Sequence, residues 1–198
     1  MELKELIQDI KEKEGFSNEE IADRLGVNKT TVGRWLRGEV TRLQEDTTRR
    51  LQEWLGFDVD ALLKGKAVLF KRPVVGFVKA GYDLFADQNY LGEEEVDYED
   101  YRRGDFFLKV QGNSMIGSGI MDGSTVYVQK TEALQSGDIG VFLVGEEVTV
   151  KKVIYKPDML ILESSNPEVP NRYFSKEEIN ELPVRALGKV LYVKTLFA

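Results

Sequence analysis

The first 63 residues carry apolar side chains at the three- and four-residue spacing of amphipathic helices. Gly15 ends the first of these helices, and Ser17 with Glu20 forms a capping box that begins the second. Two more helices and a short helical turn are expected over residues 28–36, 43–55 and 58–64. The pattern therefore predicts an all-α domain over residues 1–63.

After residue 73 the apolar residues come in short runs separated by Gly, Asn, Asp and Ser, which is typical of a mostly antiparallel sheet. Strands are expected over residues 74–78, 106–110, 125–128, 139–144, 148–155, 159–162 and 184–193. Residues 64–73 contain two clusters of basic residues with Gly and Pro, and we interpret them as the interdomain linker. The acidic run 93–100 is interpreted as an exposed loop. The predicted fold class is a multidomain α + β chain, with a mostly-β domain over residues 74–198.

The composition excludes several classes of protein. The chain has no Cys and no His, which removes disulfides, thiolate nucleophiles, Ser-His-Asp triads and the usual zinc sites. No metal or cofactor is therefore expected, and nucleophilic chemistry would need Lys or a carboxylate as its base. No apolar run is long enough for a membrane helix, and the N-terminus lacks the apolar core of a signal peptide. We expect a cytoplasmic protein without a membrane partner.

The net charge of −7 conceals a basic segment in the helical domain. Between residues 24 and 50, three acidic side chains stand against seven basic ones: Arg24, Lys29, Arg34, Arg37, Arg42, Arg49 and Arg50. This excess is compatible with one positive face that contacts phosphates, and equally with a solvated helix surface of mixed charge. Charge alone does not decide between the two.

Residues 17–38 carry the spacing of a helix-turn-helix. Ala22 allows the second helix to approach the third closely, Gly26 suits the tight turn, and Val32 packs beneath the third helix. The segment resembles the DNA-binding helix-turn-helix of the phage lambda repressor and Cro family, whose members read operator DNA as dimers. The resemblance runs through both helices without a gap.

The resemblance also implies which residues contact DNA. The third helix would present Lys29, Thr30 and Arg34 to base edges in the major groove, and Thr31 is a further candidate contact. The expected phosphate contacts are Asn18 and Arg37, which flank the two helices. For any one of these residues, the alternative is the solvent-facing side of an amphipathic helix.

Two segments of the β domain contain candidate catalytic residues. Residues 107–115 place Ser114 after a strand and a Gly turn, although such a Ser is more often only a turn residue. Residues 147–154 place Lys151 and Lys152 inside a β-branched run. Side chains alternate between the two faces of a strand, so one of the two lysines points toward the core. The alternation does not indicate which one.

From about residue 73 to 194 the chain resembles the self-cleaving C-terminal domain of LexA-type repressors, peptidases with a Ser–Lys dyad. Four matches follow the family's order, at residues 78–81, 112–115, 119–123 and 148–151. The resemblance implies a LexA- and signal-peptidase-like fold that carries both self-cleavage and dimerisation, with the cleavage segment over residues 74–90. It assigns the roles of nucleophile to Ser114, general base to Lys151, oxyanion donors to the backbone of Asn113 and Ser114, and scissile bond to Ala80–Gly81.

This chemistry sets a physical requirement for the base. A Lys side chain has an ordinary pKa of about 10.4 and is protonated at neutral pH, so it cannot accept a proton there. Burial favours the neutral amine and lowers the pKa of a Lys. Lys151 must therefore be buried if it is to activate Ser114.

These observations and resemblances predict a prophage-type transcriptional repressor that cuts itself. The expected partners are operator DNA, a second copy of the chain in a homodimer, with higher oligomers left open, and the RecA filament as stimulator of cleavage. One alternative is a DNA-binding regulator whose C-terminal domain only dimerises and which an antirepressor protein releases without cleavage. Another is a peptidase that acts on other chains, related to signal peptidases.

Overall fold

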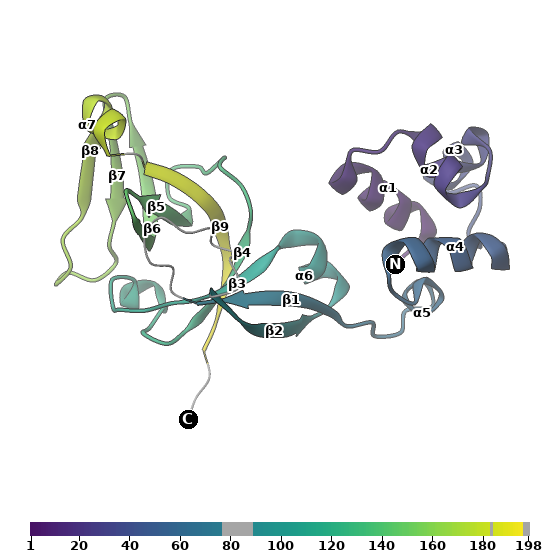
Figure 1. The fold of residues 1–198 in the computed structure, drawn as a ribbon, viewed down its shortest axis with the longest axis horizontal. Helices are drawn as coiled ribbons and strands as arrows, with labels where there is room; N and C mark the ends of the chain where they lie inside the picture. Colours follow the sequence, from purple (N-terminus) through teal and green to yellow (C-terminus); the bar gives the residue numbers. More distant parts are fainter. Residues whose placement is uncertain (77–88, 183, 196–198) are drawn as a thin grey trace. The chain divides into compact units, whose positions relative to one another are not determined.

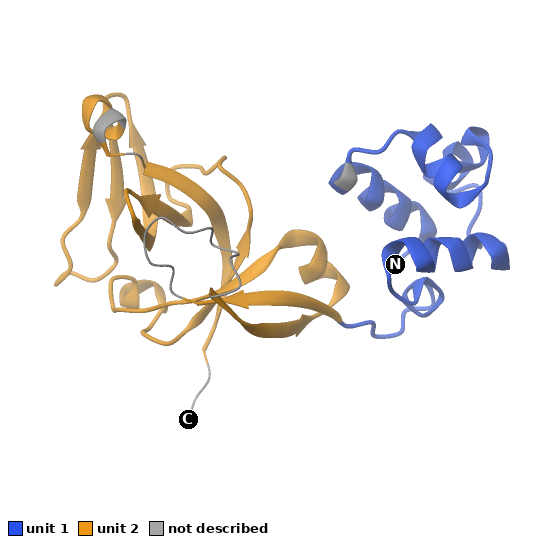
Figure 2. Ribbon diagram, in the orientation of Figure 1, with its two compact units in different colours: residues 1–69 blue, residues 70–198 orange. Residues whose placement is uncertain are grey.

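The computed structural model of the 198-residue chain describes residues 1–76, 89–182 and 184–195. The chain forms two compact units, residues 1–69 and 70–198, which Figure 2 colours separately. Every helix within the described ranges is too short or too polar to span a lipid bilayer.

The first unit is all-α, as predicted. Its helices are α1 (Leu3–Glu14), α2 (Asn18–Leu25), α3 (Lys29–Leu36), α4 (Glu45–Leu55) and α5 (Val59–Leu63). The third helix packs against both α1 and α2, and each helix contributes fully buried apolar side chains to one core, among them Ile7, Ile21, Val32, Leu51 and Val59. The helices are thus held together by burial of one apolar face each.

The boundaries of these helices follow from local chemistry. Ser17 accepts a hydrogen bond from the backbone of Glu20, whose side chain in turn accepts one from the Ser17 N–H, so the predicted capping box is present. Gly15, Gly26 and Gly56 end α1, α2 and α4 in the left-handed region. Such caps involve residues close in sequence, which is why the helical boundaries could be predicted.

The second unit is mostly β. Its strands form one sheet in the described residues, in the order β2-β1-β3-β4-β9-β5-β6-β7-β8, and the long strand β9 bends across the unit (Figure 1). The strands are β1 (Phe70–Val75), β2 (Tyr90–Val96), β3 (Phe106–Lys109), β4 (Thr125–Gln129), β5 (Ile139–Val144), β6 (Glu147–Lys156), β7 (Met159–Glu163), β8 (Arg172–Ser175) and β9 (Val184–Lys194). Short helices α6 (Tyr98–Arg103), η2 (Ile116–Ser118) and α7 (Lys176–Glu181) complete it. The pairings are antiparallel except that of β1 with β3, which is parallel.

Strand β8 and helix α7 were not predicted, and two further segments differ from the sequence-based expectation. The linker predicted over residues 64–73 is shorter, because residues 70–73 already belong to β1. The acidic run 93–100, expected to be an exposed loop, instead completes β2 and begins α6. The reason is cross-strand pairing: Lys71 lies opposite Glu95, and Lys71 also forms a 2.9 Å ion pair with Glu93. The acidic side chains of β2 thus lie opposite a basic side chain of β1 and form part of a paired strand.

The second unit contains two clusters of buried apolar side chains. One spans β1, β3, β4, β5 and β6 and includes Met115 and Ile120 from the segment between β3 and β4. The other lies between β5, β6, β7 and β8 and includes Phe142, Leu162 and Phe174. Strand β6 contributes to both, so both of its faces are covered over part of its length.

Candidate functional site

The turn between α2 and α3 has the packing that a helix-turn-helix requires. Ala22 and Val32 are buried, and Gly26 adopts a φ of +66° that is unfavourable for residues with a Cβ. The N–H of Val27 donates to the carbonyl of Ala22 at 3.0 Å, and Asn28 begins α3. The residues predicted to form the turn do form it.

The candidate DNA-contacting residues lie on or beside α3 with their side chains largely in solvent. Lys29 and Thr30 are exposed in its first turn, Thr31 is half-buried, and Arg34 is exposed further along the helix. Arg37 follows the helix as its C-cap residue and is exposed. These side chains could all reach a ligand outside the unit.

Asn18, at the start of α2, is engaged within the protein. Its side-chain oxygen accepts a hydrogen bond from the Lys11 amine at 2.8 Å. The Asn18 amide nitrogen is the group that could donate to a phosphate, because an amide oxygen only accepts hydrogen bonds.

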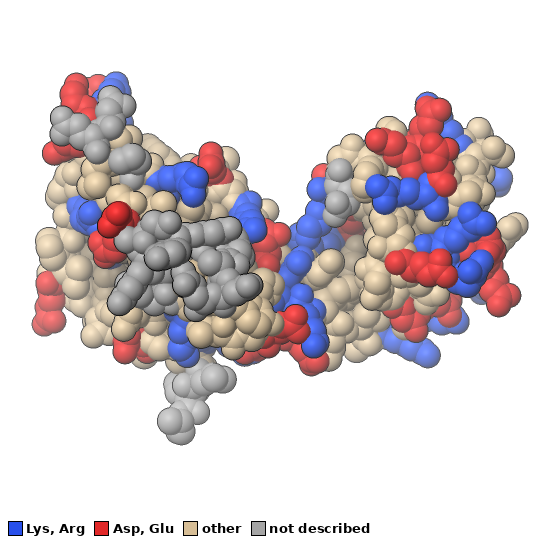
Figure 3. Space-filling view, in the orientation of Figure 1, with Lys and Arg blue, Asp and Glu red and all other residues tan. Residues whose placement is uncertain are grey.

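Carboxylates accompany the basic side chains of α3. Glu39 binds the Nε atoms of both Arg34 and Arg37, the first at 3.3 Å, and Glu19 binds Lys29 at 3.2 Å. The hydrogen bond from Arg37 holds the pKa of Glu39 below its ordinary value, so this carboxylate remains ionised at neutral pH. On the face of residues 1–69 that Figure 3 shows, basic and acidic side chains alternate rather than forming one continuous basic patch.

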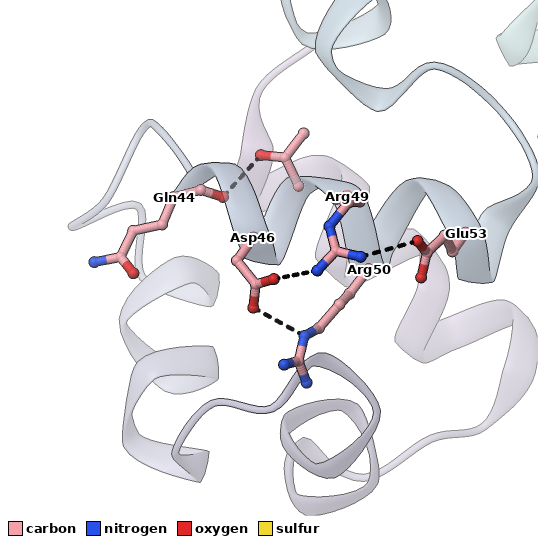
Figure 4. A network of polar contacts seen from close by, with 6 residues as sticks. Gln44, Asp46, Arg49, Arg50 and Glu53 are labelled. Carbon is pink, nitrogen blue, oxygen red and sulfur yellow. Dashed lines mark hydrogen bonds and ion pairs between the residues drawn. The ribbon is translucent and has the colours of Figure 1, made fainter.

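Helix α4 repeats this pattern of compensated charge (Figure 4). Asp46 binds both Arg49 and Arg50, and Glu53 binds Arg49 from the other side. The guanidinium of Arg50 occupies the space beside Gly26, where a Cβ would lie 2.2 Å from its nitrogen. The Arg50 side chain of α4 therefore lies against the turn between α2 and α3, where the positive φ of Gly26 favours glycine.

Ser114 lies in the turn that joins β3 to η2. The turn is shaped by Gly112, with a φ of +90°, whose N–H donates to the Asp122 carboxylate at 2.7 Å. The next residue, Met115, is 1% exposed and anchors the turn in the core, while Ser114 itself is half-buried. Within the described residues, neither the Asn113 nor the Ser114 backbone N–H donates a hydrogen bond. Oxyanion donors must be available in this way.

Lys151 is the buried member of the lysine pair on β6. It is 5% exposed, whereas the Lys152 side chain is 38% exposed and forms an ion pair with Glu163. The cross-strand neighbour of Lys151 is Gly140, which contributes no side chain of its own. The choice that side-chain alternation leaves open is therefore made by the fold, and Lys151 is the lysine withdrawn from water.

The electrostatic surroundings of Lys151 favour its neutral form. Burial lowers the pKa of Lys151, the nearby Glu147 carboxylate opposes that shift, and the Arg172 guanidinium adds to it. Glu147 is itself bound to Arg172 at 3.1 Å. The Lys151 side chain makes neither an ion pair nor a hydrogen bond with any described residue.

The fold connects the Ser114 turn, which follows β3, with strand β6, which carries Lys151, although β3 and β6 are far apart in the sheet order. Met115 and Val150, their immediate neighbours in sequence, pack in the same core cluster. The Ser164 hydroxyl donates to the Ser114 carbonyl at 2.5 Å, and Ser164 directly follows Glu163, which is paired in register with Lys152 on β6. Among the described residues, no hydrogen bond joins the Ser114 hydroxyl directly to the Lys151 amine. Such bonds commonly tighten only when the reacting group is bound.

Ala80 and Gly81 lie outside the described residues, as does most of the predicted cleavage segment 74–90. The two ends of the undescribed stretch are nevertheless fixed beside each other, because the N–H of Gly76 donates to the carbonyl of Asn89 at 2.7 Å. Strand β1, which precedes it, is parallel to β3, and Val75 is paired with Leu108. Parallel strands end at the same edge of a sheet, so the chain enters this stretch at the edge where β3 leads into the Ser114 turn.

Two residues that contact the Ser114 turn could not be found by sequence reasoning. Ser164 and Asn166, directly after β7, both bind the backbone of this turn. Their only signal in the sequence is a short polar run after an apolar strand, which is typical of any loop. Among the described residues, no group of His, Cys, Asp or Glu has the arrangement of a metal site.

Comparison with known proteins agrees with the two-part architecture. Residues 73–191 match the family described as Peptidase S24-like, and residues 2–64 match a helix-turn-helix domain. The chain is 36% identical over 121 residues to the LexA repressor of Oleidesulfovibrio alaskensis, covering 60% of this chain and 56% of that protein. It is 35% identical over 135 residues to the LexA repressor of Thermotoga petrophila, covering 67% and 66%, respectively. The LexA repressor of Erwinia tasmaniensis is 40% identical over 97 residues, 48% of each chain. The chain thus spans 48–66% of the length of these relatives.

Proposed function

Because the chain belongs to the Peptidase S24-like family, we propose that it is a sequence-specific DNA-binding transcriptional repressor that inactivates itself by cutting its own Ala80–Gly81 bond. The helix-turn-helix of residues 17–38 would bind operator DNA, and residues 70–198 would supply the self-cleaving and dimerising part. The similarity to LexA repressors supports the repressor role. The observation that carries the proposed chemistry is the burial of Lys151, which is 5% exposed and without a carboxylate partner among the described residues.

The cleavage would begin with proton transfer from Ser114 to Lys151. The neutral Lys151 amine accepts the proton of the Ser114 hydroxyl as the oxygen attacks the carbonyl carbon of Ala80. The negative charge that develops on the Ala80 oxygen is stabilised by the backbone N–H groups of Asn113 and Ser114. The ammonium of Lys151 then gives its proton to the Gly81 nitrogen as the peptide bond breaks. Water hydrolyses the ester between Ser114 and Ala80 and regenerates the hydroxyl.

Burial of Lys151 is what makes these reaction steps possible at moderate pH. A protonated Lys cannot accept the Ser114 proton, and the lowered pKa of Lys151 increases the neutral fraction. The parallel pairing of β1 with β3 supports cleavage within one chain, since β1 runs toward the edge of the sheet at which β3 leads into the Ser114 turn.

Cleavage would release operator DNA through the loss of dimer contacts. Two linked half-site readers bind together far more tightly than either alone, because the second binding event occurs at a high effective concentration. Cutting after Ala80 would separate residues 1–80 from the dimerising part and end this advantage. We propose a homodimer on a prophage-type operator, with the RecA filament on single-stranded DNA stimulating the cleavage in the cytoplasm, as in an SOS response.

The proposal is tested by incubating the purified chain at about pH 10 without partners, and at neutral pH with RecA filaments. Mass spectrometry should find fragments 1–80 and 81–198, and neither should form in the Ser114→Ala or Lys151→Ala variants. A chain that stays intact under both conditions would instead be a regulator whose C-terminal part only dimerises, released by an antirepressor protein. Cleavage of the Ser114→Ala variant by added wild-type protein would indicate a peptidase that acts between chains.

A further inference from the structure

The segment Ser164–Asn166, which follows β7, is bound to the nucleophile turn at several points. The Ser114 carbonyl accepts two hydrogen bonds, one from the Ser164 hydroxyl at 2.5 Å and one from the Asn166 N–H at 3.1 Å. The Asn166 side-chain nitrogen donates to the Asn113 carbonyl at 3.0 Å. The Ser118 N–H donates to the Ser165 hydroxyl at 3.1 Å. The segment therefore binds the backbone of the turn at Ser114 and at residues before and after it.

The contact is also close in a steric sense. A Cβ at Gly117 would lie 2.2 Å from the carbonyl oxygen of Ser165, so only glycine fits there. Asn166 is 5% exposed, and its side-chain oxygen accepts from the Glu168 N–H at 3.0 Å. This second bond fixes the orientation of the Asn166 amide. Its oxygen accepts from Glu168, so its nitrogen faces the Asn113 carbonyl.

The Asn113 carbonyl and the Ser114 N–H belong to the same peptide group. That group is planar, with its C=O and N–H pointing in opposite directions. A hydrogen bond that holds the Asn113 oxygen toward Asn166 therefore directs the Ser114 N–H away from Asn166. The Ser114 N–H is one of the two oxyanion donors in the proposed reaction.

The same segment directly follows β7, which pairs with β6, the strand that carries Lys151. Glu163, the residue directly before Ser164, is paired in register with Lys152 on β6 and bound to it by an ion pair. Segment 164–166 thus connects the strand that carries the base to the turn that carries the nucleophile.

We propose that Ser164 and Asn166 are positioning residues for self-cleavage, with Asn166 orienting the Ser114 N–H as an oxyanion donor and Ser164 fixing the Ser114 carbonyl. This inference rests on the proposed function, because it assigns these residues a role in that reaction. Neither residue touches the scissile bond in this scheme. Both act on the backbone of the turn, so they set the maximal rate of cleavage and leave the ionisation of Lys151 unchanged.

The test follows the self-cleavage of full-length variants across pH. Asn166→Leu, which has a similar volume and no amide, should lower the maximal rate about 10²–10³-fold, the usual cost of one oxyanion donor. Ser164→Ala should lower it roughly 2- to 10-fold, as expected for one hydrogen bond, and Ser164→Thr should restore it because the hydroxyl is kept. In every variant the pH at half-maximal rate should stay at the wild-type value.

Ser136→Ala is the matched control, because the Ser136 hydroxyl also binds a backbone group, the N–H of Tyr155, but lies outside the turn. It should cleave at the wild-type rate. Wild-type rates in both Asn166→Leu and Ser164→Ala would overturn the proposal while leaving the proposed function intact. A shift of the half-maximal pH would also overturn it, since the segment would then act through Lys151. If Asn166→Leu does not fold, the comparison of Ser164→Ala with Ser164→Thr decides, and a wild-type chain that never cuts removes both proposals.

Discussion

The candidate functional basic side chains of the two units lie in opposite environments. On α3, the side chains of Lys29 and Arg34 are 65% and 53% exposed, and each is paired with a carboxylate. On β6, Lys151 is 5% exposed and has no such partner among the described residues. An exposed, paired cation keeps its charge and can exchange its carboxylate for a phosphate at little cost. A buried cation without a partner is driven to lose its proton. The environment thus decides whether a basic residue serves as a charge or as a base.

The largest expected effect is on the rate of self-cleavage when the buried Lys151 is replaced. Lys151→Met keeps a long apolar side chain but removes the amine, and should lower self-cleavage by about 10²–10⁴-fold, the usual contribution of a general base. In the wild type, the rate should rise with pH as the amine loses its proton and level off above the lowered pKa of Lys151. The measurement is the rate of appearance of fragments 1–80 and 81–198 as a function of pH.

Lys152→Met is the matched control for that prediction, since it removes the neighbouring exposed amine from the same strand. It should cleave at close to the wild-type rate. If the two variants lose cleavage equally, burial does not distinguish the two lysines, and the assignment of Lys151 as the base is wrong.

The exposed side of the comparison is tested next, at Arg34. Arg34→Ala should reduce discrimination between the preferred operator and unrelated duplex DNA by about 1–3 kcal/mol, the value of one bidentate contact to guanine. The operator is first selected from random duplexes with the wild-type chain, and binding is then measured by fluorescence anisotropy. Arg185→Ala, an exposed Arg on β9, loses the same charge and should keep full discrimination. Equal discrimination by all three proteins would remove Arg34 from base recognition.

The burial of Lys151 should also be visible in stability. Between its lowered pKa and the ordinary value of about 10.4, the unfolded chain binds a proton that the folded chain has lost. The free energy of unfolding therefore rises with pH across this window, and below it the cost of burying the amine is fully present. Lys151→Met should be more stable than the wild type at pH 7, and this difference should shrink toward pH 10.

Urea unfolding at the two pH values measures this prediction. Both Trp residues lie in residues 1–69 and all eight Tyr in 70–198, so near-ultraviolet tyrosine dichroism follows the unit that contains Lys151. Lys152→Met should change the free energy of unfolding by less than about 1 kcal/mol, as expected for a partly exposed ion pair. A Lys151→Met variant that is less stable than the wild type at pH 7 would contradict the account.

The smallest expected effect concerns the carboxylate that accompanies α3. Glu39→Gln releases Arg34 and Arg37 from their shared partner, and should tighten binding to non-specific duplex DNA by roughly two- to fivefold, as expected for exposed ion pairs. The control is Glu53→Gln on α4, which changes the net charge equally but leaves Arg49 bound to Asp46. Titrations at several salt concentrations check the result. Equal tightening in both variants would mean that Glu39 acts only through net charge.

The parts of the fold that depend on neighbours in sequence could be predicted. The helices of residues 1–63, the Ser17 capping box and the glycine stops follow from spacing and local hydrogen bonds. The division into an all-α and a mostly-β part was visible for the same reason. By contrast, β1 and β2 were misread in part, because their charged residues are stabilised by partners about twenty residues away.

The candidate site shows the same limit. Its residue types and the roles of Ser114 and Lys151 came from a family resemblance, whereas alternation along β6 left two lysines open because both faces of that strand are covered over part of its length. The contacts of Ser164 and Asn166 with the Ser114 turn span about fifty residues, and nothing in a polar loop reveals what it will touch. Local chemistry predicts elements, while the fold decides which of them meet.

The central claim is that the Lys151 amine is neutral at a pH where ordinary lysines are charged. It is tested most directly by nuclear magnetic resonance titration of lysine side chains in the intact Ser114→Ala protein, with Lys151→Met used to assign the signal. The account predicts that the Lys151 signal titrates below the ordinary lysine value of about 10.4. A Lys151 signal that titrates at or above that value would contradict it.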